Sequence, residues 1–177
     1  NLKFVFEVVK IFRLNKNKSI DIINKFKNLP FRQQILFNNK NLLIMNDSKS
    51  TSFSSSMGIL KSFKNIYWIV GGLAKRGDKF NLQTEFSKNI KAYIYGKDRS
   101  IFARKLKNKM KVKKSKNLSD ILKKIIIDTR KDKLKKNIIF SPSAASFDQF
   151  RNFEERGKYF NSLLMKKNFI KKINDKK

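Results

Sequence analysis

Four short apolar runs, separated by helical patterns, constrain this chain more than any other feature. They are Asn41–Met45, Ile66–Val70, Ala92–Tyr95 and Asn137–Phe140. Each run is too short for a helix and is followed by small or polar residues, so we predict buried strands. Strands that alternate with helices form a parallel sheet with helices on both faces. The pattern predicts an α/β fold with a Rossmann-like, doubly wound sheet.

The remaining segments complete this prediction. Gln33–Phe37 is a further apolar run, joined to Asn41–Met45 by a polar turn, which is typical of a hairpin and makes the sheet only mostly parallel. A weak strand is expected at Met110–Val112. Predicted helices are Leu2–Leu14, Ser19–Phe26, Met57–Phe63, one beginning at Asp98, Leu118–Ile127 capped by Asn117, and one beginning at Asp148. The Lys-rich tail, 166–177, is expected to fray.

Two of these helices carry further expectations. The first is apolar on two sides, which is typical of a helix buried between layers, and this favours a chain that begins inside a longer protein. In the last helix we expect Phe150 and Phe160 in the core, and Phe147 and Phe153 near a pocket.

Three unusual loops follow the strands that end at Met45, Val70 and Phe140. The carboxyl ends of parallel strands share one edge of the sheet, where ligands of such folds bind. We therefore expect the three loops to lie together.

Each loop has an ordinary and a functional interpretation. The first, Asn46–Ser52, carries Lys49 and several hydroxyls that suit a carboxylate or phosphate, but such residues also begin helices. The second, Gly71–Lys75, lacks the spacing of a phosphate-binding P-loop, and paired glycines also permit a tight turn. The third, Ser141–Gly157, resembles an anion site at a helix start or an ordinary strand-to-helix connection.

Composition excludes several classes of site. The chain has no cysteine and no histidine, so thiolate chemistry and the commonest general base are absent. No apolar run approaches the roughly 20 residues of a membrane span. The net charge is +30, but 35 of the 43 basic residues are Lys, spread along the whole chain. Because base-reading proteins rely on Arg, no specific nucleic acid partner is expected; a basic nucleic-acid-binding module stays the alternative.

The three loops together resemble the Mur ligases. The matching motifs are Asp47-Ser48-Lys49-Ser50-Thr51, then Gly71-Gly72-x-x-Lys75, and then Ser141-Pro142-x-x-Ala145-Ser146-Phe147-Asp148-Gln149-Phe150-x-Asn152-Phe153-Glu154-x-Arg156-Gly157. Within this family the last motif is similar to that of the members that add D-glutamate. A related ligase with another amino-acid acceptor, of the folylpolyglutamate type for example, is the second alternative.

The resemblance implies an activity. It implies ATP-dependent addition of D-glutamate to UDP-N-acetylmuramoyl-L-alanine through an acyl phosphate, a step of peptidoglycan precursor synthesis needed for cell wall, cell shape and cell division. It also implies ATP and magnesium as cofactors, held mainly by segments this chain does not contain, together with a cytoplasmic location and a monomeric complete enzyme. Residues 1–32 would end the central ATP-binding domain, and residues 33–177 would form the D-glutamate-binding domain. The chain alone is not expected to be active.

The resemblance also implies site residues. Lys49 would steady developing negative charge. The expected D-glutamate contacts are Thr51, Lys75, Ser146, Phe147 and Phe153. The expected nucleotide contacts are Asn1, Arg32 and Asp47. No metal ligand is assigned. Phe31 stands where the family has histidine, which is expected to weaken a nucleotide contact.

Overall fold

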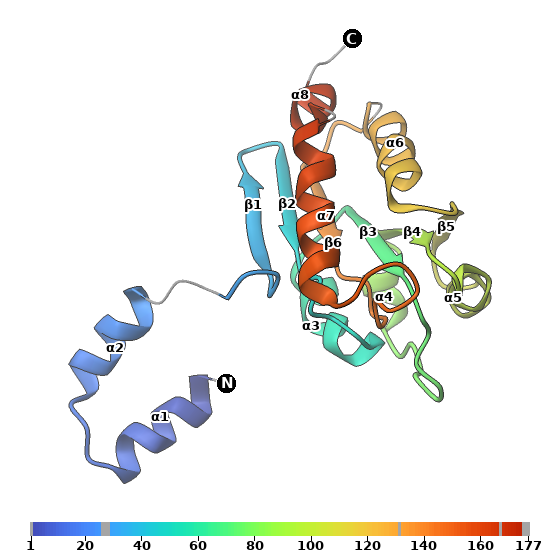
Figure 1. Cartoon of the computed structure of the whole chain (residues 1–177). Helices are drawn as coiled ribbons and strands as arrows, with labels where there is room; N and C mark the ends of the chain where they lie inside the picture. The colour runs from blue at the N-terminus through green and yellow to red at the C-terminus, as the bar shows by residue number, and fades with distance from the viewer. Residues whose placement is uncertain (1, 26–28, 131, 167, 175–177) are drawn as a thin grey trace.

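The computed structural model describes residues 2–25, 29–130, 132–166 and 168–174. Within these residues a six-stranded sheet has the order β1-β2-β6-β3-β4-β5 (Figure 1). The strands are β1 (Gln34–Asn38), β2 (Leu42–Asn46), β3 (Ile66–Gly71), β4 (Ile90–Tyr95), β5 (Lys111–Lys114) and β6 (Lys136–Phe140). β1 pairs antiparallel with β2, and the other neighbouring strands pair in parallel. The predicted hairpin and doubly wound, mostly parallel sheet are confirmed.

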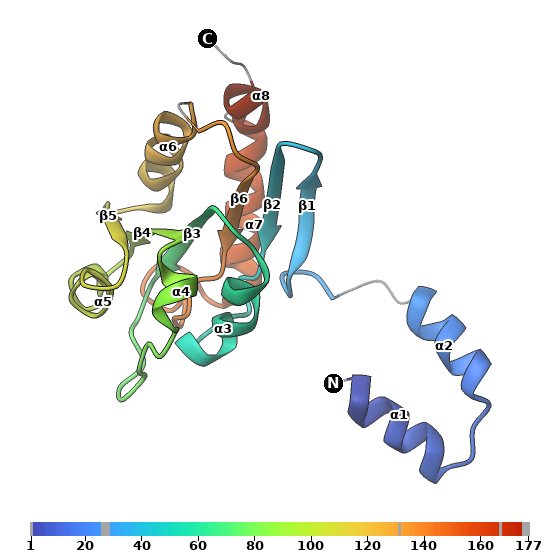
Figure 2. The same cartoon turned by 180° about the vertical axis from the view of Figure 1, so that it is seen from behind.

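Helices cover both faces of the sheet, as the two opposite views show (Figures 1 and 2). They are α3 (Phe53–Ser62), α4 (Thr84–Ser87), α5 (Arg99–Leu106), α6 (Leu118–Thr129), α7 (Phe153–Lys166) and α8 (Phe169–Asn174). Side chains alternate along each strand. In β3, Tyr67 and Ile69 join a core with α6, α7 and α8, whereas Trp68 and Val70 join a second core with α3 and α5. This two-sided burial explains why the strands are almost uninterrupted apolar runs.

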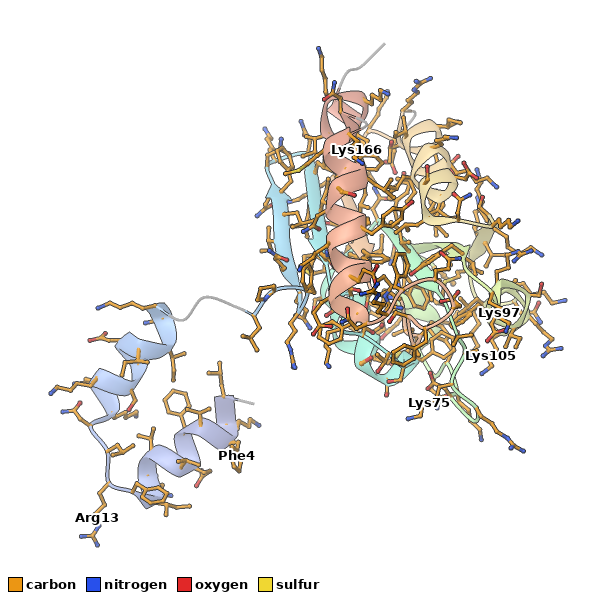
Figure 3. The ribbon with its side chains drawn as sticks, in the orientation of Figure 1. Phe4, Arg13, Lys75, Lys97, Lys105 and Lys166 are labelled. Carbon is orange, nitrogen blue, oxygen red and sulfur yellow. The ribbon has the colours of Figure 1, made fainter. Side chains whose placement is uncertain are left out.

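Helices α1 (Leu2–Ile11) and α2 (Lys16–Lys25) pack against each other and lie apart from the sheet in both views (Figures 1 and 2). Several large apolar side chains of this pair are exposed, including Phe4 at 73% and Ile11 at 72%. In this structure the first helix is therefore not buried between layers. Figure 3 shows Phe4 on α1 and Arg13 in the connection between α1 and α2.

One predicted helix start is correct in residue and in mechanism, and another lies at a different residue. The Asn117 side chain accepts a hydrogen bond from the Asp120 amide at the start of α6. At the start of α3 the Ser52 and Ser55 side chains form a reciprocal capping box. This capping box begins α3 at Phe53, four residues before the predicted start.

Two predictions about the carboxyl-terminal segment are wrong. The last long helix begins at Phe153 and not at Asp148, because the Asp148 carboxylate accepts a hydrogen bond from the Lys97 amide after β4. Asn152 supplies the cap by accepting from the Glu155 amide. The tail also does not simply fray, since α8 buries the fully enclosed ring of Phe169 in the core.

Candidate functional site

The three loops predicted to share one edge of the sheet are joined by backbone hydrogen bonds. After β2, the Asp47 amide donates to the Phe140 carbonyl at the end of β6 (2.7 Å). After β3, Leu73 and Ala145 form an isolated antiparallel bridge with two hydrogen bonds, of 3.0 and 3.2 Å. The carboxyl ends of β2, β6 and β3 therefore support one continuous loop surface.

The glycine pair after β3 is required by close backbone packing. Gly71 and Gly72 both have φ of 131°, a region that favours glycine. A Cβ atom on Gly71 would lie 2.0 Å from the Tyr95 carbonyl oxygen, and one on Gly72 would lie 2.5 Å from the Ala145 carbonyl oxygen. The tight-turn interpretation of this pair is sufficient to explain both glycines.

Arg156 holds two of these loops to α7. Its guanidinium is completely buried. Nε donates to the Ser48 hydroxyl (3.0 Å) and Nη2 to the Ser48 carbonyl (2.6 Å), while Nη1 donates to the Ala144 carbonyl (2.9 Å). The planar fork of donors suits this arrangement because three acceptors on two loops surround one side chain. Arg156 thereby fixes the residues just before Lys49 and Ser146.

A second contact, between Phe31 and Gly157, fixes the entry into the sheet. The ring of Phe31 is buried, and it lies so close to α7 that a Cβ atom on Gly157 would be 2.3 Å from Phe31 Cδ1. The Phe31 carbonyl accepts a hydrogen bond from the Lys49 amide (3.0 Å). The residue that departs from the family pattern therefore has a packing role here.

Lys49 and Phe153 are brought together as expected for one site. The Lys49 ammonium lies 4.0 Å from the centre of the Phe153 ring, within the range of a cation–π contact. Both side chains are half-buried. Because Lys49 follows β2 and Phe153 begins α7, the contact joins the first and third motifs.

The carboxylate of Asp47 is turned into the protein. Oδ2 accepts from the Ser141 hydroxyl (2.8 Å) and Oδ1 from the Gln33 amide (3.1 Å). Burial raises the pKa of Asp47, although these hydrogen bonds and the charge of Arg32 act in the opposite direction. In this arrangement the carboxylate holds the loop after β2 to the loop after β6 through its hydrogen bond with Ser141.

The other candidate residues differ in exposure. Arg32, Thr51 and Lys75 are exposed, whereas Ser146 is buried. Figure 3 shows Lys75 and Lys97 at the end of the sheet domain opposite Lys166.

The aromatic residues of the third motif divide in a way the sequence predicted only in part. Phe160 is enclosed and stacks on Phe140 (4.3 Å between ring centres), as expected for a core residue. Phe150 is only half-buried and lies against Tyr159. Phe147 is 71% exposed and projects from the loop surface. Asn1, the remaining candidate, lies outside the described residues.

Two residues with central contacts were not assigned a role from the sequence. Arg156 stood in the third motif without a partner, and Asn46 was counted only as the first residue of a loop. The buried Asn46 amide donates to the Gly157 carbonyl (3.0 Å) and to the Asn161 side chain (2.8 Å). A signal existed for Arg156, because a basic residue beside a glycine and four positions before the buried Phe160 lies on the same inner face of the helix.

The described residues contain no group of three His, Cys, Asp or Glu side chains placed to hold a metal ion. Within the same part of the chain, no helix has the length and apolar character to cross a membrane.

Comparison with known proteins gives consistent relatives. No family model matches the chain. The UDP-N-acetylmuramoylalanine–D-glutamate ligase of Wolbachia sp. subsp. Brugia malayi is 40% identical over 153 residues, which is 86% of this chain and 31% of the relative. That of Rickettsia felis is 37% identical over 164 residues, covering 92% and 36%. The chain thus spans about a third of the length of these curated relatives.

A solved structure supports the fold. The MurF ligase from Thermotoga maritima in complex with ADP aligns with a TM-score of 0.52 and 17% sequence identity, covering 90% of this chain and 36% of that chain. At this identity the likeness concerns the arrangement of the strands and helices.

Proposed function

Because the chain belongs to the Mur ligase family, we propose that it is the part of a UDP-N-acetylmuramoylalanine–D-glutamate ligase that holds D-glutamate. In this proposal residues 1–32 end the ATP-binding domain and residues 33–177 form the D-glutamate-binding domain. The complete enzyme acts as a monomer in the cytoplasm, and the segments that bind most of the ATP lie outside this chain.

The observation that carries the proposal is the placement of Lys49 over the ring of Phe153 on a basic loop surface. D-glutamate has two carboxylates, and ammonium groups of lysine bind such groups through charge-assisted hydrogen bonds. Lys75, exposed on the neighbouring loop, supplies a second ammonium. Thr51, Ser146 and Phe147 complete the expected contacts from the same edge of the sheet.

The chemistry assigns this part of the chain to positioning and charge stabilisation. A carboxylate is a poor acyl donor, so phosphorylation by ATP makes it reactive, and the amine of D-glutamate then displaces phosphate. Holding the amino acid by its carboxylates directs the amine towards the acyl carbon. Lys49 stabilises negative charge that develops on the acyl phosphate.

Arg32 and Asp47 are the described residues that this proposal assigns to the nucleotide. Arg32 is exposed at the entry to β1 and suits a phosphate, and its place before the hairpin fits a hinge that closes over the nucleotide. Asp47 accepts ribose hydroxyls in this proposal only after its internal hydrogen bonds rearrange. The described residues contain no group of three His, Cys, Asp or Glu side chains placed to hold a metal ion, and in this proposal magnesium is held mainly by segments outside this chain.

The test uses a complete ligase, in which this chain is joined to the amino-terminal two thirds of the Rickettsia felis relative. Phosphate release is measured with ATP, UDP-N-acetylmuramoyl-L-alanine and D-glutamate. We expect Lys75→Ala to raise the KM for D-glutamate about 10- to 100-fold. This range corresponds to the loss of one hydrogen bond to a charged group, which contributes about 1.5–3 kcal/mol. Lys97→Ala, at an exposed lysine on the loop after β4, is the matched control and should leave that KM unchanged.

The acceptor decides between this proposal and its alternatives. Phosphate release with L-lysine or L-glutamate in place of D-glutamate would assign the chain to a related ligase with another amino-acid acceptor. Equal KM values for Lys75→Ala and Lys97→Ala would remove Lys75 from the site.

A further inference from the structure

A continuous line of side-chain oxygens runs from the buried carboxylate of Asp47 to the surface at the start of α3. From the inside outward, the hydroxyls belong to Ser141, Ser56, Ser50 and Ser55, which we call the serine chain. Starting from Asp47 Oδ2, successive oxygens are 2.8, 2.7, 2.6 and 2.8 Å apart. The inner three serines are buried, and Ser55 is exposed.

Two further contacts extend this network, and the Ser55 hydroxyl also accepts from the Ser52 amide (3.2 Å) and the Ser52 hydroxyl (3.3 Å), which bring their own protons. At the outer end the Ser55 hydroxyl donates to the Ser52 carbonyl (2.7 Å). Ser143 is a side branch, because its hydroxyl lies 2.6 Å from that of Ser56. The nearest other acceptor for Ser143, the Ser141 carbonyl, is much farther away at 3.5 Å. The shorter distance favours donation from Ser143 to Ser56, and the proton count below uses this direction.

The number of protons in this network depends on Asp47. A hydroxyl has one proton to donate, and an ionised carboxylate has none. Six contacts join Asp47, the four serines of the chain, Ser143 and the Ser52 carbonyl. The five hydroxyls supply five protons, so ionised Asp47 leaves one contact without a proton. Protonated Asp47 supplies the sixth, and every contact then holds one.

The direction of the hydrogen bonds follows from the same count. With Asp47 protonated, each group donates outward, from Asp47 to Ser141 and onward to the Ser52 carbonyl. With Asp47 ionised, each serine of the chain donates inward, and the contact between Ser55 and the Ser52 carbonyl is the one that has no proton. That position is at the exposed end, where water can supply a replacement.

We infer that Asp47 and the serine chain form a proton relay between the buried carboxyl group and solvent at Ser55. On ionisation, Asp47 passes its proton to Ser141, and each serine passes its own proton to the next. Ser55 gives a proton to a water molecule, so one proton leaves Asp47 and one reaches solvent. Asp47 thus changes its charge without opening of the fold.

The surroundings of Asp47 place the proton of its neutral form on Oδ2. The Gln33 amide donates to Oδ1, which leaves Oδ2 to carry the proton towards Ser141. Arg32, on the segment before β1, is the charged group of the described residues that acts on Asp47, and it favours the ionised form. The loop after β6 contributes the Ser141 hydroxyl, whose hydrogen bond also favours the ionised form. Burial nevertheless outweighs these effects and raises the pKa of Asp47.

The test is a titration of the Asp47 side-chain carboxyl carbon by NMR, assigned with Asp47→Asn, in the 177-residue chain. Ser56→Ala and Ser50→Ala interrupt the serine chain. In Ser50→Ala the inward pattern satisfies the ionised form, whereas the protonated form leaves the Ser56 hydroxyl without an acceptor. In Ser56→Ala the Ser143 hydroxyl loses its Ser56 partner in both forms, and the protonated form also leaves the Ser141 hydroxyl without an acceptor. We expect each variant to lower the pKa of Asp47 by roughly one unit, the equivalent of one buried hydrogen bond.

Ser143→Ala is the matched control, because it removes a buried hydroxyl beside Ser56 without interrupting the serine chain. Ser143→Ala removes one hydroxyl proton and one hydrogen-bond contact, so the balance of protons and contacts along the serine chain is unchanged. The pKa of Asp47 should therefore stay at the wild-type value. Ser50 is the sharper of the two test positions, since two serines separate its hydroxyl from the carboxylate. An unchanged pKa in Ser50→Ala, or equal shifts in Ser56→Ala and Ser143→Ala, would overturn the relay.

Discussion

Arg156 offers the strongest test of how the site is held together. Replacing it with methionine keeps most of the side-chain volume and removes all three hydrogen bonds to Ser48 and Ala144. Two buried carbonyl oxygens then lose their donors, at about 1–3 kcal/mol each. The variant regains part of this cost because a buried charge, itself unfavourable by several kcal/mol, is removed. We expect Arg156→Met to lower the free energy of unfolding by about 2–4 kcal/mol.

Arg156→Lys separates charge from geometry. A lysine keeps the positive charge but carries its donors on one tetrahedral nitrogen, which cannot match a planar fork to acceptors on two loops. We therefore expect Arg156→Lys to be at least as unstable as Arg156→Met. Urea unfolding followed by fluorescence of Trp68, the single tryptophan, measures both, with m-values close to the wild type.

The exposed Arg151 of the same loop provides the control. Arg151→Met and Arg151→Lys should change stability by no more than about 0.5 kcal/mol. Amide hydrogen exchange adds a local measurement, because loss of the Arg156 contacts should speed exchange in residues 46–50 and 141–147. A lysine variant as stable as the wild type would refute the argument, since charge alone would then be sufficient.

Two further predictions concern Gly157 and Asp47. Gly157→Ala should destabilise the protein by about 1–3 kcal/mol, because the new methyl group overlaps the Phe31 ring. In a Phe31→Ala background the same substitution should stabilise the protein by up to about 1 kcal/mol, because alanine has a higher helix propensity than glycine. Urea unfolding measures both effects, and a change of the same sign in both backgrounds would contradict the overlap. A raised pKa means that folded Asp47 binds its proton more tightly than the unfolded chain, so wild-type stability should fall relative to Asp47→Asn as pH rises from below 3.8 through the folded pKa. Denaturant midpoints across this range test the sign, and a difference independent of pH would contradict it.

Much of the architecture follows from local sequence. The strands were identifiable because burial on both faces makes each an apolar run, and the shared carboxyl edge follows from parallel pairing alone. Asn117 was identifiable as a cap because its partner, the Asp120 amide, lies three residues away. The meeting of Lys49 with Phe153 was also expected, from the resemblance between motifs.

The errors occurred where a side chain has a distant partner. Asp148 has the composition of a helix cap, but its carboxylate binds the amide of Lys97, 51 residues earlier. The serine chain could not be predicted for the same reason, because Ser56 in α3 and Ser141 in the loop after β6 are 85 residues apart in the sequence. Local patterns favour an ordinary capping role for such residues, and only the folded chain brings their hydroxyls into contact.

The structure also separates two kinds of residue in the three motifs. Arg156, Gly157, Gly71 and Gly72 are explained by packing and buried hydrogen bonds. Lys75 and Phe147 are not, because both are exposed on the loop surface. Exposed residues gain little stability from the fold, so a ligand is the simpler reason for an ammonium and a bare phenylalanine ring at the carboxyl edge of a sheet. The buried members of the motifs thus build the loops, and the exposed members are the ones whose replacement should change binding while stability is retained.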